Sequence, residues 1–271
     1  MDDTWKLKVW GVRGSAPVPE PDYAGYGGNT SCFSIERGDE LVVLDAGSGL
    51  VALGDELVRR RMRRVDILIS HLHLDHVMGL FIFPLLHDAM AQIHLYGRPG
   101  LGQALNGLVG PPFWPVGLAQ CRAAVQVHEV RADRPFTLAD GGAPGLTIAA
   151  LEGNHPDGCF YYRLDWDGRS LVYALDCELE EDMAARMAQF ARGADVLVWD
   201  SGFFPGELVR GWGHSTWEEG LAVGRAAQAG QMLMTHYGRK HSDLSVREQE
   251  RLACRTDSRI QFAREGMVIG L

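Results

Sequence analysis

The sequence predicts an α/β fold in which two β-sheets pack face to face and helices cover the outside. Two observations support this fold class. Short runs of strand-forming residues predominate early in each half of the chain, and segments with helical apolar spacing separate the later runs. Length alone allows one large domain or two small ones. Because no linker or internal repeat interrupts the chain, we expect a single domain over residues 1–271.

The N-terminal third alternates strand-like runs with glycine turns. Leu50–Met62 has apolar residues at Leu50, Leu53, Leu57 and Val58, which is the spacing of an amphipathic helix. The VDILIS stretch that follows is an apolar run, as is typical of a buried strand. From β-branched content and length we expect strands at Trp5–Val12, Ser31–Glu36, Glu40–Asp45 and Val65–Ser70.

The remaining two thirds continue the strand-like runs and add three helical segments between the later ones. The expected helices span Glu180–Arg192, Thr216–Ala229 and Val246–Arg255. The expected strands span Gln92–Tyr96, Ala124–Val130, Leu146–Leu151, Phe160–Trp166, Ser170–Leu175, Val196–Trp199, Met232–Thr235 and Ile260–Phe262.

Composition and charge limit the classes of partner. The formal net charge is −9, and an acidic surface repels phosphate backbones, so we expect no avid binding to DNA or RNA. A small anionic substrate is still compatible, because a bound metal can reverse the local sign. The five cysteines are scattered without a CxxC pair, which fits a reducing cytoplasm. The start, MDDTWKLKVWGV, has acids where a signal peptide has bases, and no run reaches the roughly 18 apolar residues that cross a bilayer, so we expect a cytoplasmic protein without membrane contact.

Residues 69–79 read ISHLHLDHVMG and crowd three imidazoles and a carboxylate into six positions. They follow the apolar run VDILIS, so a buried strand holds them at a sheet edge. His71 and His73 are two apart in an extended segment and can point to one side. Asp75 and His76 fall near the start of the next turn and can serve a second centre. Neutral imidazole and carboxylate suit zinc, manganese or iron(II), so this pattern predicts a metal site.

Three distant residues offer the missing ligands. His155 follows LTIAALEGN, Asp176 follows SLVYAL, and His236 follows QMLMT, which is the same placement after an apolar strand as that of His71. If these strands are neighbours, their ends converge on one edge, and the two oxygens of Asp176 can bridge two cations. Each residue alone also has an ordinary explanation, because Asp, Asn and His are common in turns.

His214 lies in GWGHSTWEEG, directly before an expected helix. Ser215 or Thr216 with Glu218 or Glu219 forms a helix-start signal, so His214 can be interpreted as part of a cap. The functional interpretation is a proton donor or oxyanion contact beside the metals. The other histidines have no comparable setting, and we expect structural roles for His87, His94, His128 and His241.

With these residues assembled, the chain resembles the metallo-β-lactamase superfamily over nearly its whole length. The superfamily motif HxHxDH is met at residues 71–76, and its upstream Asp-x-Gly, a support for the site loop, at residues 45–47. The third motif histidine matches His155, the bridging aspartate Asp176 and the final histidine His236. The resemblance implies a four-layer αββα sandwich of two mixed β-sheets.

The same resemblance implies two divalent metal ions, with zinc expected first and manganese or iron also suited to the ligands. An aspartate at position 176, where classical lactamases have cysteine, argues against antibiotic hydrolysis. Asp75 would both bind metal and orient the nucleophile. In the implied arrangement His71, His73 and His155 bind one metal, Asp75, His76 and His236 bind the other, and Asp176 bridges them.

The closer match is to the branch that holds ribonuclease Z and small phosphodiesterases. There a His-Ser-Thr segment precedes the last ligand by one helix and one strand, and here His214 precedes His236 by 22 residues in that pattern. VWGVRGSAPVP, GGNTSCFSIE and GWGHSTWEE also resemble the cyclic-nucleotide phosphodiesterase-like hydrolases. Tyr237 stands where that group commonly has a second histidine, and SHLHLDH has leucines where the group often has Thr and Trp. These departures bear on the substrate and not on the metals.

We therefore expect a metal-dependent phosphodiesterase for small phosphodiesters, cyclic ones included, that uses a metal-bridging hydroxide with help from His214. A lactonase or other ester hydrolase, and a non-catalytic metal-binding accessory protein, remain as alternatives. The resemblance is also compatible with a homodimer. The loops around the site that we expect to shape the substrate hold Phe113, Trp114, Phe203, Phe204 and Trp212.

Transfer RNA and DNA are expected not to be partners. Ribonuclease Z carries a long arm for transfer RNA between the third histidine and the bridging aspartate, whereas His155 and Asp176 are only 21 residues apart here. The net charge of −9 points the same way.

Overall fold

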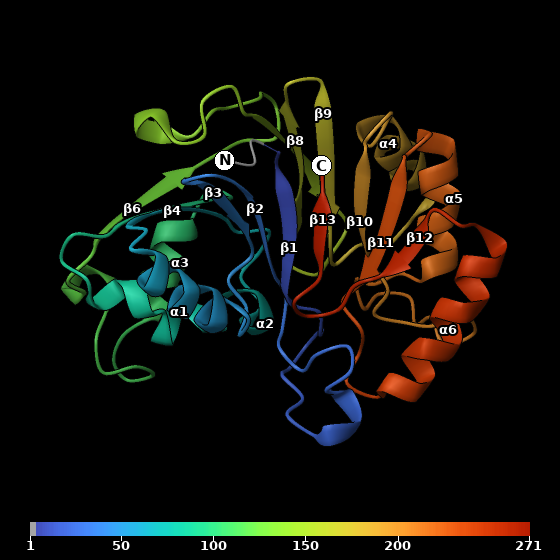
Figure 1. The fold of residues 1–271 in the computed structure, drawn as a ribbon, viewed down its shortest axis with the longest axis horizontal. Coiled ribbons are helices and arrows are strands. Elements are labelled where there is room, and N and C mark those ends of the chain that lie inside the picture. Colours follow the sequence, from blue (N-terminus) through green and yellow to red (C-terminus); the bar gives the residue numbers. More distant parts are fainter. Residues whose placement is uncertain (1–3) are drawn as a thin grey trace.

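The computed structural model describes residues 4–271, which form four layers (Figure 1). A seven-stranded sheet and a six-stranded sheet face each other in the middle. Helices α1 (Leu50–Arg60) and α3 (Leu101–Leu108) lie outside the first sheet, and α4 (Glu181–Phe190), α5 (Trp217–Ala227) and α6 (Asp243–Thr256) lie outside the second. The expected αββα sandwich is confirmed.

The seven-stranded sheet is mixed. Its first neighbours are antiparallel, and from β3 onwards they are parallel. A two-residue connection joins β2 to β3, which suits an antiparallel pair, whereas α1 carries the chain across to the parallel strand β4. In spatial order the strands are β13 (Val268–Gly270), β1 (Lys6–Gly11), β2 (Cys32–Arg37), β3 (Glu40–Leu44), β4 (Arg64–Leu68), β5 (Gln92–Gly97) and β6 (Ala124–Glu129).

The six-stranded sheet begins with two antiparallel hairpins and ends in parallel strands connected by α4, α5 and α6. The turn between β8 and β9 is Asp167-Gly168, and both residues have positive φ (46° and 75°), as the twist of a two-residue hairpin requires. The strand order is β12 (Ile260–Phe262), β11 (Gln231–Thr235), β10 (Val196–Asp200), β9 (Arg169–Ala174), β8 (Cys159–Trp166) and β7 (Thr147–Gly153).

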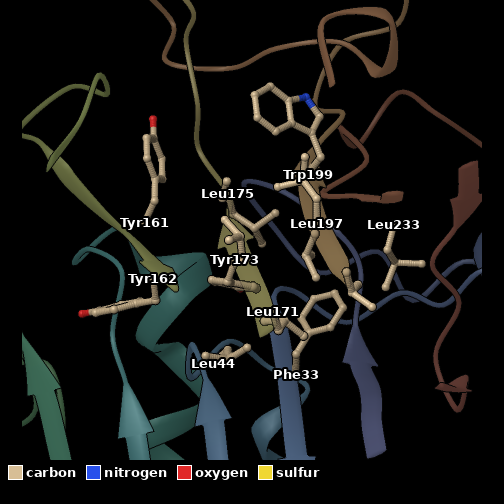
Figure 2. Close-up of a cluster of buried hydrophobic side chains, with 14 of the residues drawn as sticks. Phe33, Leu44, Tyr161, Tyr162, Leu171, Tyr173, Leu175, Leu197, Trp199 and Leu233 are labelled. Atoms are coloured by element: carbon tan, nitrogen blue, oxygen red, sulfur yellow. The ribbon is translucent and has the colours of Figure 1, made fainter. Parts of the chain in front are cut away.

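The main hydrophobic core lies between the two sheets. Figure 2 shows Phe33 and Leu44 of the first sheet beside Leu171 and Tyr173 of the second, and the Phe33 and Tyr173 rings meet edge to face at 5.7 Å. Alternate residues of strands β3, β4 and β5 belong to a second core under α1 and α3, so these strands are covered on both faces. This double burial explains why Ile67, Leu68 and Ile69 are apolar at consecutive positions.

The expected helix start before α5 is confirmed in detail. Thr216 Oγ1 accepts a hydrogen bond from the Glu219 N–H (3.3 Å), and the Glu219 carboxylate accepts one from the Thr216 N–H (3.2 Å). This reciprocal cap fixes the point at which the loop that holds His214 becomes a helix.

Three elements escaped the sequence prediction, namely the four-residue helix α2 (Leu74–Val77), helix α3 and strand β13. Helix α3 contains Gly102 and Gly107, which disfavour helix on their own, and packing of buried Leu101 and Leu105 under the sheet decides its conformation. Strand β13 has three residues, too few to show a period, and pairing with β1 orders it. Among residues 4–271, no helix has the length and apolar content needed to span a membrane. The 3₁₀-helices lie at Pro21–Tyr23, Met78–Ile82, Pro84–His87, Leu118–Gln120 and Ala139–Gly141.

Candidate metal centre

The first part of the site is the turn that leaves strand β4. Ser70 carries the chain out of the sheet to His71. His73 is still extended (φ −61°, ψ 146°) and directly precedes the four-residue helix α2 (Leu74–Val77), so Asp75 and His76 stand in one helical turn. A strand end followed at once by a short helix therefore gathers all four side chains of the HxHxDH motif.

Asp45, the residue after β3, holds this turn in place. Its Oδ1 accepts the Ser70 N–H (2.7 Å), and its Oδ2 accepts from the Ser70 hydroxyl (2.9 Å) and the Tyr173 hydroxyl (2.9 Å). The same Oδ2 lies 2.7 Å from His76 Nδ1. Because that nitrogen donates to Asp45, His76 Nε2 presents its lone pair to the site.

Three residues come from the second sheet, and each lies just beyond the carboxyl end of a strand. His155 follows β7, Asp176 follows β9 and His236 follows β11. Face-to-face packing brings these ends to the turn after β4. One ligand atom of each residue lies within 4.8 Å of its companions in four overlapping groups: His71, His73 and His155; His71, His76 and Asp176; Asp75, His76 and His236; and Asp176, His214 and His236.

Asp176 stands between two sets of histidines. Its Oδ1 lies 3.9 Å from His71 Nε2 and 3.7 Å from His155 Nε2. Its Oδ2 lies 2.9 Å from His76 Nε2 and 3.3 Å from His236 Nε2. One oxygen therefore faces each set, which is the arrangement that a carboxylate between two cations needs.

The remaining two motif residues complete the two sets. His73 Nδ1 lies 2.9 Å from His155 Nε2. Asp75 Oδ2 lies 3.3 Å from His76 Nε2 and 3.4 Å from His236 Nε2, and it also accepts the Ser15 N–H at 2.7 Å. The structure thus brings together all seven residues that were expected to be ligands, in overlapping groups of which one, His71, His76 and Asp176, contains members of both expected sets.

The polar atoms of the cluster fit divalent cations. His155 Nδ1 donates to the Gly213 carbonyl (2.9 Å), and His71 Nδ1 lies 3.0 Å from the Ser70 hydroxyl, whose own proton goes to Asp45. The Nε2 atoms of both histidines are therefore lone pairs that face the cluster. Within residues 4–271, His71 Nε2 and Asp176 Oδ2 are buried without a hydrogen-bond partner, which is costly unless a cation takes that place.

Charge favours cations in the same place. Burial lowers the pKa of His71 well below its usual value, so this imidazole is in the neutral form that binds metal. Burial lowers the pKa of His236 too, but the facing carboxylates of Asp176 and Asp200 outweigh it and raise the pKa to about 10. Burial raises the pKa of Asp176, but the surrounding histidines hold it well below the usual range. The carboxylates thus stay ionised and attract positive charge into the cluster.

His214 lies at the edge of the cluster and is oriented by Asp200. Its Nδ1 is 3.1 Å from Asp200 Oδ2 and 3.6 Å from Asp176 Oδ1, and its side chain keeps 16% of its surface exposed. Asp200 also accepts the backbone N–H groups of Cys177 (3.0 Å) and Gly202 (2.7 Å), so its carboxylate is fixed. A histidine whose Nδ1 is held in this way offers Nε2 for proton transfer.

Asp200 is the residue that the sequence prediction missed. It ends the apolar strand VLVWD, and its placement after a strand is the signal that singled out Asp176. Burial raises its pKa, but His214 outweighs this and lowers the pKa to about 2. Asp200 Oδ1 also lies 3.5 Å from His236 Nδ1, so one carboxylate supports two histidines of the site.

The loop that holds His214 is fastened by the buried carboxylate of Glu178. It accepts the Gly211 N–H (2.7 Å) and the Gly213 N–H (2.8 Å). Gly213 has φ +77°, and a Cβ there would collide with the His155 imidazole. Gly213 of GWGH is therefore required by close approach to a predicted ligand, and it is not merely part of a helix start.

Three cavities border the cluster, and the one lined by His155, Glu178 and Arg210 has a volume of about 680 Å³. The other two have more than one histidine of the cluster in their walls. One, of about 380 Å³, is lined by His71 and His73 and also by Arg98. The other, of about 410 Å³, is lined by His214 and His236, by the aromatic residues Phe203 and Trp212, and by Arg239 and Lys240. Neither cavity has Phe113 or Trp114 in its wall among the described residues, so the expectation that these two shape the site finds no support there.

The four histidines expected to be structural lie outside these groups within the described chain. His94 Nδ1 pairs with His128 Nε2 at 3.0 Å on the first sheet. His241 stacks on Phe204 with ring centroids 3.7 Å apart and lies 2.8 Å from a Glu207 oxygen.

Comparison with known proteins adds family and fold. A family model described as "Beta-lactamase superfamily domain" matches residues 41–237. The chain is 25% identical to Ribonuclease Z of Thermoplasma acidophilum over 295 aligned positions, which cover 91% of this chain and 90% of the relative. The metallo-beta-lactamase fold protein YhfI from Bacillus subtilis superposes with a TM-score of 0.76 at 21% identity and 100% coverage of both chains. The short form of human tRNase Z gives 0.70 at 19% identity, covering 97% of this chain and 98% of that one.

These comparisons correct one expectation from the sequence. We expected that transfer RNA is not a partner, and relatives named Ribonuclease Z that match most of the chain contradict this. The physical reason is that net charge sums the whole surface, whereas phosphate responds to charge near the site. Arg98, Arg239 and Lys240 line two of the cavities beside the cluster, so a chain with net charge −9 still presents cations there.

Proposed function

The chain belongs to the β-lactamase superfamily, whose members are metal-dependent hydrolases, and from this premise we propose that it is a dinuclear phosphodiesterase. Its substrates are phosphodiesters. Small and cyclic ones are indicated by the sequence, and RNA is indicated by the relatives named Ribonuclease Z.

The seven clustered side chains would hold the two cations, divided as their distances suggest. Zinc suits the donors best, and manganese or iron(II) accept the same imidazole and carboxylate ligands. When bound, such a pair lowers the pKa of water to about 7 and offsets the charge that builds on phosphorus. The proposed ligands of one cation are His71, His73 and His155. The proposed ligands of the other are Asp75, His76 and His236, and Asp176 lies between the two groups.

The observation that carries the choice of a phosphodiester over an uncharged ester is the set of cations Arg98, Arg239 and Lys240 in the cavity walls, which suit an anionic substrate. The Asp200–His214 pair then supplies a proton for the leaving group. A phosphodiester releases an alkoxide, which leaves more easily when a proton is delivered to it. Asp200 fixes His214 Nδ1 at 3.1 Å, so Nε2 is the atom from which a proton would pass to the leaving oxygen. Asp75, whose Oδ2 accepts a hydrogen bond from the Ser15 N–H, orients the attacking group.

The test is turnover on metal-reconstituted protein. The panel holds bis-p-nitrophenyl phosphate, 2′,3′- and 3′,5′-cyclic nucleotides, a transfer-RNA precursor and a homoserine lactone. We expect metal-dependent cleavage of phosphodiesters and little cleavage of the lactone. Hydrolysis of the lactone alone would contradict the proposal. A His128→Ala variant, which alters a histidine remote from the cluster, is the control and should keep full activity.

Two further points belong to the same proposal. We propose that residues 1–271 act as one domain, since the predicted ligands come from both sheets. We also propose that the protein works in the cytoplasm, because its five cysteines are free thiols, three of them buried, and thiols persist in a reducing compartment.

A further inference from the structure

We propose that the cavity beside His214 and His236 binds the flat ring of a nucleobase, with Trp212 as the stacking surface and Arg239 as a phosphate contact. This inference rests on the proposed phosphodiesterase function and names its substrate class as nucleotide diesters. It also assigns a specificity-determining residue, Trp212, on a loop that holds no predicted metal ligand.

The first argument is the position of the cavity. It opens directly onto the cluster, because His214 and His236 form part of its wall with ring centroids 5.2 Å apart. A phosphodiester has two ester substituents, and the cavity with His71 and His73 in its wall also borders the cluster. A phosphodiester bound at the cluster would place one substituent in each of these two cavities. The substituent on the His214 side is the one that would leave with the protonated oxygen.

The second argument is the aromatic wall. The Trp212 indole is 63% exposed at the rim, although a ring of this size is usually largely buried. It stands against Phe203 with ring centroids 6.3 Å apart at 60°, so one edge is supported and a face is left for a ligand. Every nucleobase has a π face that stacks on such a ring.

Two glycines keep this cavity open next to the aromatic wall. Gly14 and Gly202 line it, and a Cβ at Gly14 would lie 2.6 Å from the His236 ring. A Cβ at Gly202 would lie 3.1 Å from His214. The His236 ring thus leaves no room for a Cβ at Gly14, and a Cβ at Gly202 would be tight against His214. The absence of side chains at both positions keeps the cavity of about 410 Å³ open.

The third argument is charge. Arg239 is 71% exposed and has only a distant partner, Glu20 at 3.8 Å, so its guanidinium is available to an anion. Lys240 Nζ lies 3.1 Å from Glu207 Oε2 and 5.7 Å from the Phe203 ring centroid. None of the described residues in this cavity wall is acidic. An apolar acyl chain would desolvate these cations without replacing their water, whereas a nucleotide offers both a ring and phosphate oxygens.

The experiment compares two ligands that differ only in the base. Calorimetric titration of the metal-loaded protein measures Kd for adenosine 5′-monophosphate and for ribose 5-phosphate. We expect the nucleotide to bind about tenfold more tightly, which lies within the roughly 5- to 150-fold that stacking of a base on an aromatic side chain contributes. Trp212→Ala should abolish the preference without changing the Kd of ribose 5-phosphate, and Trp212→Phe should retain most of it.

Two further variants locate the effect. Arg239→Gln should weaken both ligands by the same factor, because both carry phosphate. Phe113→Ala removes another aromatic ring, 72% exposed and outside both cavities, and should change neither Kd. Equal binding of the two ligands by the wild type, or equal weakening of both by Trp212→Ala, overturns the proposal.

Turnover separates this inference from the proposed function. A dinucleotide and its analogue that lacks the base on the leaving side should differ about tenfold in kcat/KM, and Trp212→Ala should remove the difference. If no phosphodiester is cleaved while the Trp212-dependent preference in binding persists, the phosphodiesterase proposal fails and the base pocket stands. If diesters are cleaved but base and Trp212 make no difference, the pocket proposal alone fails.

Discussion

Replacement of Asp45 by Asn tests whether a buried carboxylate positions the metal-binding turn. Asp45 takes four hydrogen bonds, one at Oδ1 from the Ser70 N–H and three at Oδ2. Asn has a single acceptor oxygen. If that oxygen takes the position of Oδ2, the amide nitrogen takes the position of Oδ1, which lies 2.7 Å from the Ser70 nitrogen. Both nitrogens are donors, so no hydrogen bond forms between them. One unpaired buried donor costs about 1–3 kcal/mol, and three bonds that lose a charged acceptor cost roughly 1 kcal/mol each, so we expect about 4–6 kcal/mol of lost stability.

That loss should appear in two measurements. Thermal unfolding of the chelator-treated variant, followed by circular dichroism, should show a Tm lower by roughly 10 °C for a chain of this size. Metal affinity, measured by competition with a chelator, should fall about 10–100-fold, because His76 loses the partner that fixes its Nδ1 proton. Tyr173→Phe is the matched control, since it removes only one bond to the same oxygen. If Asp45→Asn weakens metal binding no more than this control does, Asp45 does not orient His76.

Four further outcomes follow from the same geometry. His214→Ala should lower kcat about 10²–10⁴-fold with unchanged metal content, and loss of metal would show that its role is misassigned. Gly213→Ala should weaken metal binding, because the new Cβ meets His155. Its control is Gly211→Ala, which is also at positive φ (84°) but has open space around it, and which should cost only backbone strain of about 1 kcal/mol in unfolding experiments. Arg13→Ala removes a fully buried guanidinium that donates to three backbone carbonyls and to the Asp243 carboxylate, and should cost about 3–5 kcal/mol in denaturant unfolding with little effect on metal affinity. Metal at a hundredfold excess over its Kd should raise the free energy of unfolding by about 2.7 kcal/mol, and an unchanged Tm would count against tight sites.

Local signals in the chain were sufficient for much of the fold. Leu50–Arg60 shows helical apolar spacing, and the VDILIS run shows a strand covered on both faces, because side-chain burial imposes these periods directly. The cap at Thr216 is likewise a short-range contact between residues three apart. Helix α3 lacks such a signal, since its glycines oppose helix and only contacts with distant strands compensate for them.

The sequence alone determined which residue types stand after which apolar strands, and so nominated His71, His155, Asp176 and His236 as partners. Only the packing of one sheet on the other decided how far apart their nitrogens and oxygens lie. The same packing places Asp176 Oδ1 toward His71 and Asp176 Oδ2 toward His76. Asp200 shows the limit most clearly: its strand-end position was visible, but its contact with His214 depends on a loop folded back by Glu178. The physical reason is that the type and order of the side chains can be read directly from the sequence, whereas the distances between them depend on contacts between segments far apart in the chain.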